Sequence, residues 1–390
     1  MNKNSSTKLP RAFIIGILVF FFYGIYQLLT VIYVNRTSYF SPYYTEEVYK
    51  SLESAFDSSQ YRIKENPGII PDETVYSYAA GAYLHGRDPI LINSERTPLG
   101  KYIIALFILF FKNDKFVVIP FGLLTLVSIW LLAVQVFKNK IIALLPVTFF
   151  CFERLFLDQF IYTPLLDIIH LPFILLTLYF FLQEHKKGSY WITSIMLGFT
   201  IATKTVYSGM LLTVVFLTYL LLQKKFDNVL HFILYLPLSF IILLLSYTQT
   251  FLHGYTFIDF IGFQKWILLY DKSKLLYPFS IWRLVFLNQW QTWWGDFRLL
   301  KADDWNIAWP IFTILTLVLI FLVLVKKIRV TPAISVLCLW FLYYSVYLSL
   351  GIASSRFLLP ILPIMYMLGF RLVIEYLSKF FLRKSAARIH

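Results

Sequence analysis

Charged residues interrupt two hydrophobic regions in the segment 71–102, PDETVYSYAAGAYLHGRDPILINSERTPLGKY. Those suited to group transfer are Asp72, Glu73, Glu95, Arg96 and Lys101. A carboxylate can accept the proton of an attacking hydroxyl, and Arg or Lys can hold a phosphate as it departs. The sequence has neither a phosphate-binding loop nor a nucleotide-binding pattern, so we expect a lipid to carry the phosphate-bearing donor. Asp72 is the expected general base, with Glu73 in reserve.

Further ionisable residues lie at the boundaries of later hydrophobic runs: Glu153, Arg154, Asp158, Asp167, Lys204 and Arg356. Asp167 lies about one helical turn inside an apolar run, and Lys204 lies between two such runs. A charge at the membrane centre costs about 2.5–3.5 kcal/mol on insertion scales, and less near the interface. Both residues therefore require a partner or a water-filled cavity.

Each of these charges also has a purely structural interpretation. Asp167 could pair with a neighbouring helix, and Lys204 could extend its ammonium to the membrane interface. Asp72 follows Pro71 and precedes an apolar-periodic run, so it is a good helix N-cap, and the helix dipole favours Glu73 in the first turn. Structural and catalytic roles coexist only if the carboxylate also faces the site.

The composition indicates an integral membrane protein. Of 390 residues, 59% are hydrophobic and only 14% are charged, which is more apolar surface than a soluble core could bury. Several runs approach or exceed the roughly 20 residues of a membrane-spanning helix: 11–34, 116–137, 230–251, 309–325 and 331–350. We predict an all-α polytopic membrane protein with about 10–11 transmembrane helices. The first run has the length of a retained signal anchor.

The net charge of +14 comes from short Lys and Arg clusters between the apolar runs. With no basic face, this pattern argues against nucleic acid as a partner and indicates positive-inside topology. All of these clusters lie on the cytoplasmic side if the short run 102–111 enters the membrane without crossing it. The clusters are Lys3/Lys8/Arg11, Lys138/Lys140, Lys186/Lys187, Lys224/Lys225, Lys326/Lys327/Arg329 and Arg383/Lys384.

This membrane topology predicts a single membrane module over residues 1–390, with the site on the extracytoplasmic side. Its parts are a first span (12–34), an external loop with juxtamembrane helices and the dip (35–115), central spans (116–251), an external Trp-rich loop (252–305), C-terminal spans (306–374) and a basic cytoplasmic tail (375–390). Helical spacing of Val48, Leu52 and Phe56, and of Val75, Ala79 and Ala82, predicts the juxtamembrane helices at the membrane surface. The two cysteines, Cys151 and Cys338, show no metal-binding spacing and no disulfide framework.

The order of the motifs resembles the protein O-mannosyltransferase and aminoarabinose-transferase families, which are GT-C class glycosyltransferases. In those families an Asp-Glu pair starts a juxtamembrane helix, as Asp72-Glu73 is expected to do, and a basic-Pro-Pro-Leu or His-Pro-Pro-Leu-Gly-Lys segment follows. Here ERTPLGK (95–101) has Thr97 in place of the first Pro and Arg96 at the basic position.

Later segments resemble further family motifs in the same order. They are FERLFLDQFIYTPLLDIIHLPFILL, LGFTIATK, GYTFIDFIGFQKWILLYD and SSRFLLPILP. Either Asp158 or Asp167 could correspond to the family's Leu-Asp motif, and we favour Asp167 because it lies at a span boundary. The separate lumenal domain of the eukaryotic mannosyltransferases has no counterpart here.

The resemblance implies a GT-C-like fold and a polyprenyl- or dolichyl-phosphate sugar as donor, with inversion at the anomeric carbon. The sugar, mannose or another, goes to a hydroxyl of an acceptor protein, glycan or lipid. The implied site comprises catalytic Asp72, Glu73 and Asp167, phosphate-binding Arg96, Lys101, Lys204 and Arg356, and supporting Glu95, Glu153, Arg154 and Asp158. The carboxylates could hold Mg²⁺ or Mn²⁺, although Arg96 and Lys204 could neutralise a phosphate without metal.

Two other classes of function fit the composition. A transporter or lipid flippase could use the same charges to couple ions, but it would be expected to show internal symmetry and a site near the membrane midplane. The sequence shows no internal repeat. A non-catalytic assembly partner or lipid-binding scaffold would leave the ordered motifs without a reason. A membrane glycosyltransferase is therefore the favoured function.

Overall fold

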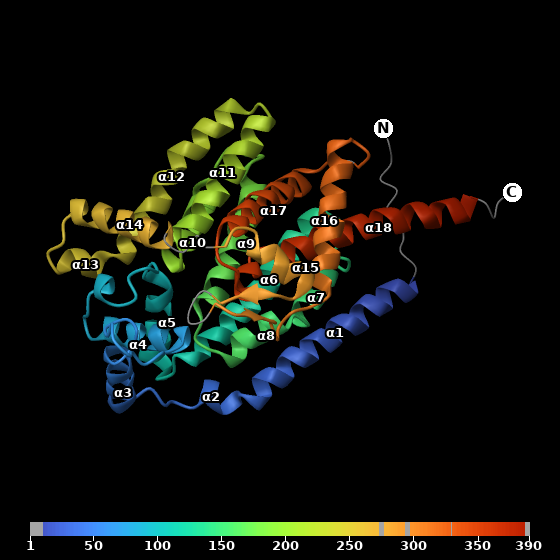
Figure 1. Cartoon of the computed structure of the whole chain (residues 1–390). Helices are drawn as coiled ribbons and strands as arrows, with labels where there is room; N and C mark the ends of the chain where they lie inside the picture. Colours follow the sequence, from blue (N-terminus) through green and yellow to red (C-terminus); the bar gives the residue numbers. More distant parts are fainter. Residues whose placement is uncertain (1–10, 273–276, 293–296, 329, 387–390) are drawn as a thin grey trace.

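The computed structural model describes residues 11–272, 277–292, 297–328 and 330–386. Most of the described chain is helical (Figure 1). In chain order the elements are α1 (Arg11–Val34), α2 (Arg36–Phe40), α3 (Glu46–Asp57), α4 (Asp72–Leu84), η1 (Pro89–Leu91), α5 (Leu99–Phe111), η2 (Lys115–Val117), α6 (Val118–Phe137), α7 (Leu144–Cys151), α8 (Arg154–Ile161), α9 (Leu166–Glu184), α10 (Trp191–Thr203), α11 (Val206–Leu222), α12 (Phe226–Ser246), α13 (Thr248–Leu252), α14 (Phe257–Lys272), α15 (Ser280–Leu287), β1 (Trp290–Gln291), β2 (Leu299–Leu300), α16 (Ala308–Leu324), α17 (Pro332–Leu350), η3 (Ser355–Leu358) and α18 (Leu362–Ala386). The short strands β1 and β2 pair antiparallel, with Trp290 opposite Leu300.

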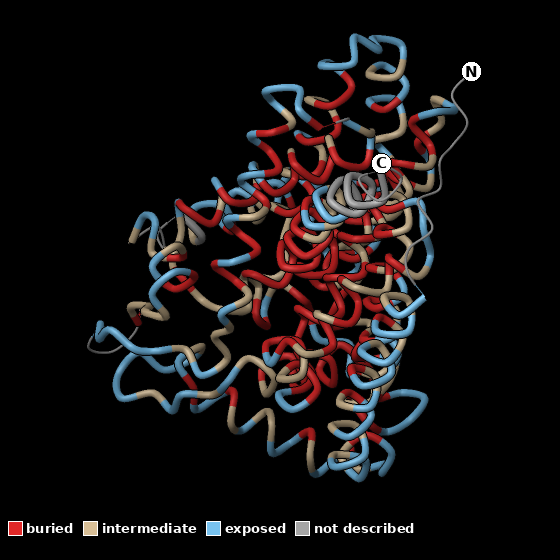
Figure 2. Tube along the Cα trace, turned by 90° about the vertical axis from the view of Figure 1, so that its right-hand side faces the viewer, coloured by how far each residue is buried: buried red, intermediate tan, exposed pale blue. Residues whose placement is uncertain are grey.

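The predicted all-α membrane fold is confirmed. Among the described residues, 5 helices are long and apolar enough to cross a membrane, and α5, α10, α11 and α16 are shorter apolar helices. In α9, 78% of the apolar window is buried inside the protein, compared with 17% in α1. Since lipid tails can cover an apolar helix as well as protein can, α9 is a central helix and α1 faces outward, as the burial colours in Figure 2 also show.

The two helices expected in the first loop are present as α3 and α4, but α4 is not a surface helix. Every residue from Val75 to Tyr83 is buried, because α4 packs between α3 and α5. Small residues permit this close packing: a Cβ on Gly81 would lie 2.2 Å from the hydroxyl of Tyr44. The Tyr44 hydroxyl donates to the carbonyl of Ser77 over 2.9 Å. The burial fixes the start of α4, which carries Asp72 and Glu73.

The expected dip over residues 102–111 lies in the short helix α5, whose first turn is held tightly against α9 and α10. A Cβ on Gly100 would lie 2.5 Å from the carbonyl oxygen of Thr203 and 2.7 Å from Cδ2 of Leu166. The amide of Thr97 donates to the carbonyl of Lys204 over 3.3 Å. The glycine therefore allows the loop that carries Arg96 to meet the end of α10.

Several basic clusters gather at the opposite end of the helices. Asn228 donates to the carbonyl of His185 over 3.1 Å, which joins the first turn of α12 to the α9–α10 loop. Burial and the nearby charge of Lys186 lower the pKa of Lys138. This grouping is what the positive-inside rule requires. That these clusters face the cytoplasm stays a prediction. Lys3, Lys8 and Arg329 lie outside the described residues, as do the side chains of Arg383 and Lys384.

Candidate functional site

The first turn of α4 carries Asp72, which pairs with an arginine from the C-terminal part of the protein. Pro71 is the N-cap residue, so Asp72 lies one position inside the helix and does not cap it as expected. Its carboxylate is therefore available to a distant partner: Oδ2 of Asp72 lies 2.5 Å from Nη1 of Arg356. Both side chains keep a little more than a quarter of their surface exposed, 29% and 28%. Glu73 makes no ion pair or hydrogen bond with the residues that the structure describes.

A second ion pair lies deeper in the protein and joins α9 to the end of α10. Asp167 is in the first turn of α9, Lys204 is the C-cap residue of α10, and the ammonium of Lys204 binds Oδ1 of Asp167. Both residues are buried. The other carboxylate oxygen, Oδ2 of Asp167, is buried with no hydrogen-bond partner among the described residues. Such an atom is costly to bury alone, and it marks a place where a ligand group or water would fit.

Arg356 connects the two ion pairs electrostatically. Burial alone would lower the pKa of its guanidinium, but Asp72 and Asp167 together raise it above the ordinary value. The ring of Phe357 lies 5.9 Å from the Arg356 guanidinium and 5.9 Å from the Lys204 ammonium. Two carboxylates and two cations from distant segments therefore form one partly enclosed cluster.

Two tyrosines that were not predicted as site residues border this cluster. Tyr76 lies one helical turn after Asp72 and is buried. Burial is the main cause that raises its pKa, followed by the charge of Asp72, with Arg96 opposing. Burial likewise raises the pKa of Tyr61, followed by the charges of Glu95 and Asp72. The spacing between Asp72 and Tyr76 was the available sequence signal, whereas Tyr61 carried none.

The two predicted phosphate ligands in the loop before α5, Arg96 and Lys101, lie in different surroundings. Lys101 is fully buried, and its ammonium donates to the carbonyls of Asn93 and Arg96 over 2.8 and 3.0 Å. It therefore holds the loop together and does not face open space. Glu95 accepts a 2.8 Å hydrogen bond from the side chain of Asn93. Arg96 is half-buried, and its charge acts on both Tyr76 and Tyr61, which places it at the border of the cluster.

The predicted supporting residues Glu153, Arg154 and Asp158 form a separate group. Glu153 is buried and accepts hydrogen bonds from the Tyr366 hydroxyl, from the Trp309 indole over 3.1 Å and from Asn306 over 3.2 Å. Burial raises the pKa of Glu153 to about 7, although the Tyr366 and Trp309 hydrogen bonds oppose the increase. This group fixes the end of the Trp-rich loop and does not enter the cluster.

Arg154 extends the attachment of that loop. Its guanidinium donates to the carbonyl of Asp303 over 2.9 Å and lies 3.9 Å from Asp158. Asp304 in turn receives a hydrogen bond from Ser355, the neighbour of Arg356. Of the two candidates for the Leu-Asp motif, Asp167 reaches a site cation and Asp158 pairs with Arg154.

No group of three or more His, Cys, Asp or Glu residues is placed to hold a metal ion within the described part of the chain. Asp72 and Asp167 each face a cation. A bound divalent ion therefore stays a prediction from sequence. The positive charges that could bind a phosphate here are those of Arg and Lys side chains.

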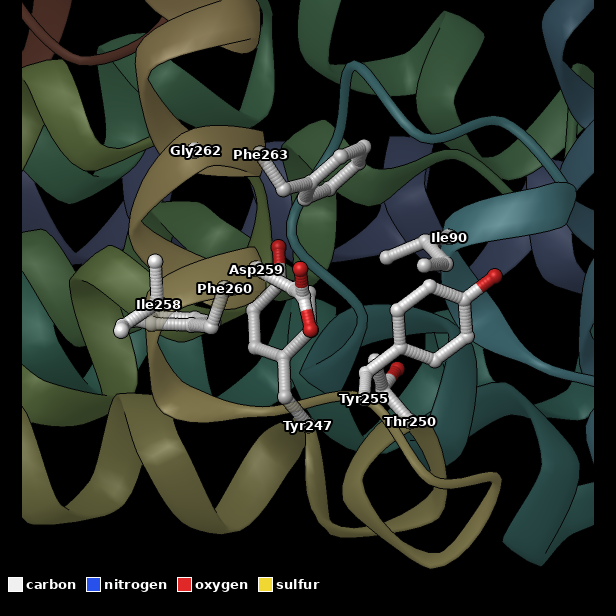
Figure 3. A pocket seen from close by; sticks show the side chains of 9 residues that line it. All are labelled: Ile90, Tyr247, Thr250, Tyr255, Ile258, Asp259, Phe260, Gly262 and Phe263. Carbon is white, nitrogen blue, oxygen red and sulfur yellow. The ribbon is translucent and has the colours of Figure 1, made fainter.

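An apolar cavity of about 420 Å³ lies beside α14. Figure 3 shows Tyr247, Phe260 and Phe263 around it, with Ile90 of η1 opposite. From Phe263 the aromatic rings continue along α14: Phe263 stacks on Trp266 at 5.7 Å and Trp266 on Tyr270 at 5.3 Å. Tyr270 is one of the groups that act on Tyr61, so this apolar surface leads from the cavity toward the charged cluster.

Residues 95–250 match the family model described as dolichyl-phosphate-mannose-protein mannosyltransferase. The expected resemblance to this family is confirmed. The matched segment of this chain contains Arg96, Asp167 and Lys204, whereas Asp72 and Arg356 lie on either side of it. No curated protein matches the sequence.

The fold is similar to that of a solved membrane-protein structure. The chain is similar to apo ArnT from Cupriavidus metallidurans, with a TM-score of 0.51 and 16% identity over 84% of this chain and 58% of that one. For ArnT from the same organism bound to undecaprenyl phosphate, the TM-score is 0.48, with 13% identity over 83% and 58% of the two chains. The protein thus spans a little over half the length of these relatives, and identity at this level establishes fold only.

Proposed function

We propose that the protein is an integral-membrane glycosyltransferase. It transfers a sugar from a polyprenyl-phosphate donor to an acceptor hydroxyl on the extracytoplasmic side. The observation that carries the proposal is the cluster in which Asp72 faces Arg356 beside the buried Asp167–Lys204 pair. A base next to several cations, at the ends of apolar helices, suits transfer from a lipid phosphate.

In the proposed reaction, Asp72 accepts the proton of the acceptor hydroxyl while the hydroxyl oxygen bonds to the anomeric carbon. The bond from that carbon to the phosphate oxygen breaks, and its electron pair leaves with the lipid phosphate. The departing phosphate needs no acid, so one base and several cations suffice and the configuration inverts. Arg96, Lys204 and Arg356 stabilise the charge that develops on the phosphate.

Arg356 has two partners at different stages of this reaction. In the structure its guanidinium contacts Asp72. A phosphate bound in the cluster would compete for the same guanidinium, since Arg binds phosphate through two parallel hydrogen bonds. Donor binding would thereby release Asp72 to accept the hydroxyl proton.

The apolar cavity beside α14 and the aromatic rings along that helix supply a path for the lipid. A polyprenyl chain is entirely apolar and gains from contact with such a surface. The phosphate would lie in the charged cluster while part of the chain follows α14.

The test is mass spectrometry of polyprenyl-phosphate sugars in cells that lack the gene. We expect one such lipid to accumulate and to return to its normal level when the wild-type gene is restored. Asp72→Asn should fail to restore it. Asp227→Asn is the matched control, because Asp227 is an exposed acid in the first turn of α12. Unchanged lipid levels in the deletion strain would contradict the proposal.

A further inference from the structure

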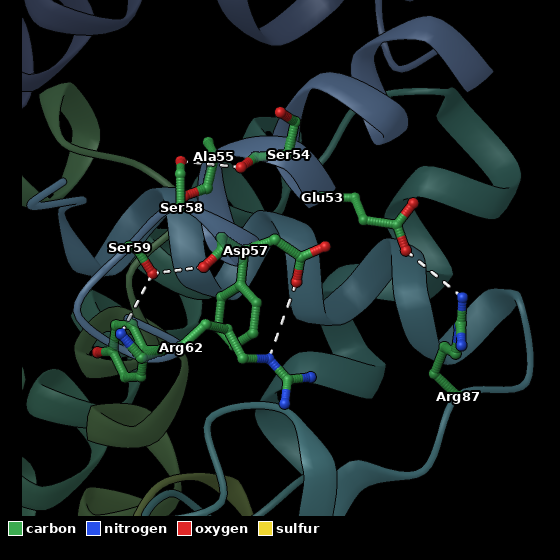
Figure 4. Close-up of polar contacts among 10 residues, drawn as sticks. Glu53, Ser54, Ala55, Asp57, Ser58, Ser59, Arg62 and Arg87 are labelled. Carbon is green, nitrogen blue, oxygen red and sulfur yellow. Dashed lines mark hydrogen bonds and ion pairs between the residues drawn. The ribbon is translucent and has the colours of Figure 1, made fainter. Parts of the chain in front are cut away.

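A small polar groove lies on the outer side of the first loop, apart from the apolar cavity beside α14. It has a volume of about 180 Å³ and is lined by Glu53, Asp57, Arg62, Tyr78, Arg87, Leu91 and Ile92. Its lining comes from α3, α4 and the loops that follow each of them. Figure 4 shows the Arg62–Asp57 and Arg87–Glu53 pairs on opposite sides of this region.

The two ion pairs are loose and leave most of their hydrogen-bonding capacity unused. Nε of Arg62 lies 3.8 Å from Asp57, and Nη2 of Arg87 lies 3.5 Å from Glu53. A close charge-assisted hydrogen bond is about 2.7–2.9 Å long. A guanidinium has five N–H donors and a carboxylate has about four acceptor positions. Exposed pairs of this kind add little to stability, so stability alone does not account for four charges in one groove.

The backbone that carries these side chains is well fixed. The side-chain amide of Gln60 forms two 3.0 Å hydrogen bonds with the backbone of Ile70, and the amide of Arg62 donates to the carbonyl of Ser59 over 2.9 Å. The amide of Arg87 donates to the carbonyl of Ala82 over 2.9 Å. The groove is therefore preformed, which reduces the entropy lost when a ligand binds.

The groove adjoins the charged cluster through two segments of chain. Tyr61 precedes Arg62, and besides its burial the charges of Glu95, Asp72 and Arg96 act on the pKa of its phenol. Leu91 and Ile92 lead directly into the loop that Lys101 holds around Asn93 and Arg96. A ligand in the groove would thus lie next to segments that also border the cluster.

We infer that this groove binds the acceptor, and that the acceptor is a glycan. The inference rests on the proposed function, because it places the second substrate of that reaction. Two carboxylates and two guanidiniums offer acceptors and donors to sugar hydroxyls without a net charge. The side chain of Tyr78 adds an aromatic residue to the lining. Four of the seven lining residues are charged, and the small volume suits one sugar residue.

Direct binding can be measured without any enzymatic reaction. Ser54 is exposed and does not line the groove, and the native Cys151 and Cys338 are buried, so Ser54→Cys accepts a single fluorescent label. The purified full-length protein is titrated with the methyl glycosides of mannose, glucose, galactose and arabinose, and separately with a short seryl peptide. We expect a saturable fluorescence change with at least one glycoside, weakened about tenfold or more when Arg62 and Arg87 are both changed to Ala.

The matched control is Lys64→Ala, which removes an exposed charge from the same loop outside the groove. It should bind the glycoside like the unsubstituted labelled protein. No saturable response to any of the glycosides, or a response that survives in the double Arg variant, would overturn the inference. Saturable binding of the peptide alone would also overturn it and would assign the groove to a protein acceptor.

Kinetic measurements test the acceptor groove and the proposed function independently. With a radiolabelled polyprenyl-phosphate sugar, the double Arg variant should transfer less sugar to the acceptor but release free sugar to water at the wild-type rate. Equal loss of both reactions would place the two arginines in the donor site and contradict an acceptor groove. If the wild-type protein neither transfers sugar nor releases it to water while glycoside binding persists, the proposed function fails and the binding groove stands.

Discussion

The guanidinium of Arg356 lies 2.5 Å from Oδ2 of Asp72. This contact joins η3, near the end of the chain, to the first turn of α4. It places the expected general base beside a cation that could also bind the leaving phosphate. The pair lies partly exposed at the ends of the helices, whereas the Asp167–Lys204 pair is buried beneath.

Asp72→Asn is expected to reduce turnover by about 10²–10⁴-fold, because the amide cannot accept the proton of the acceptor hydroxyl. Protein yield and donor binding should be preserved, since Pro71 and not Asp72 is the N-cap residue. Turnover is measured with purified protein and a saturating donor. If Asp72→Asn stays active while Glu73→Gln or Asp167→Asn is inactive, the base is one of those residues.

Substitutions in the buried Asp167–Lys204 pair should distinguish its effect on stability from its effect on donor binding. Lys204→Met leaves the Asp167 carboxylate buried without its cation, so we expect a loss of about 3–5 kcal/mol in stability. The double variant Asp167→Asn/Lys204→Gln replaces the pair with neutral side chains that can hydrogen-bond. It should recover the thermal stability but keep a raised apparent donor KM. Recovery of normal donor KM as well would mean that Lys204 acts only as a structural partner of Asp167.

Arg96 and Lys101 should respond differently to substitution. Lys101→Met removes the ammonium that binds the carbonyls of Asn93 and Arg96, so it should lower the melting temperature. Arg96→Ala should leave the melting temperature nearly unchanged and raise the apparent donor KM. Melting curves and donor titrations of both variants make the comparison. A stable Lys101→Met variant with impaired donor binding would make Lys101 a phosphate ligand after all.

Glu153 should make stability decrease as the pH rises. Burial raises its pKa from 4.5 to about 7 in the folded protein, so folding favours the protonated form. The stabilisation is complete below about pH 4.5 and is lost as the pH rises toward 7, an effect of about 3 kcal/mol. Melting temperatures of Glu153→Gln should therefore depend less on pH across this interval than those of the wild type. Glu47→Gln, which changes an exposed acid of α3, should keep the wild-type dependence.

Cysteine labelling in intact cells tests the orientation. Lys64 and Lys187 are exposed residues in loops at opposite ends of the helices, and the native cysteines are buried. A membrane-impermeant maleimide should label Lys64→Cys in intact cells and Lys187→Cys only after lysis. The reverse pattern would place the charged cluster on the cytoplasmic side and remove the basis for extracytoplasmic transfer.

The sequence by itself determined the class of protein and most of its helices. Long apolar runs require helices in a membrane, because backbone polar groups find no partners in lipid. Helical spacing likewise predicted α3 and α4, and the charges of Asp72, Asp167, Lys204 and Arg356 at apolar boundaries marked them as site candidates. These features are local, so a single stretch of sequence contains them.

Only the tertiary structure decided which charges meet. Asp72 pairs with Arg356 and Asp167 with Lys204 because close contacts, such as that of Gly100 with Thr203, set how the helices pack. Lys101 has the same charge as Arg96, yet the fold of its loop directs its ammonium into the protein. The burial of α4 also depended on its neighbours, since small residues permit close packing without revealing which helix supplies it. Contacts between distant segments depend on the shapes of both partners, and no local pattern in the sequence encodes that pairing.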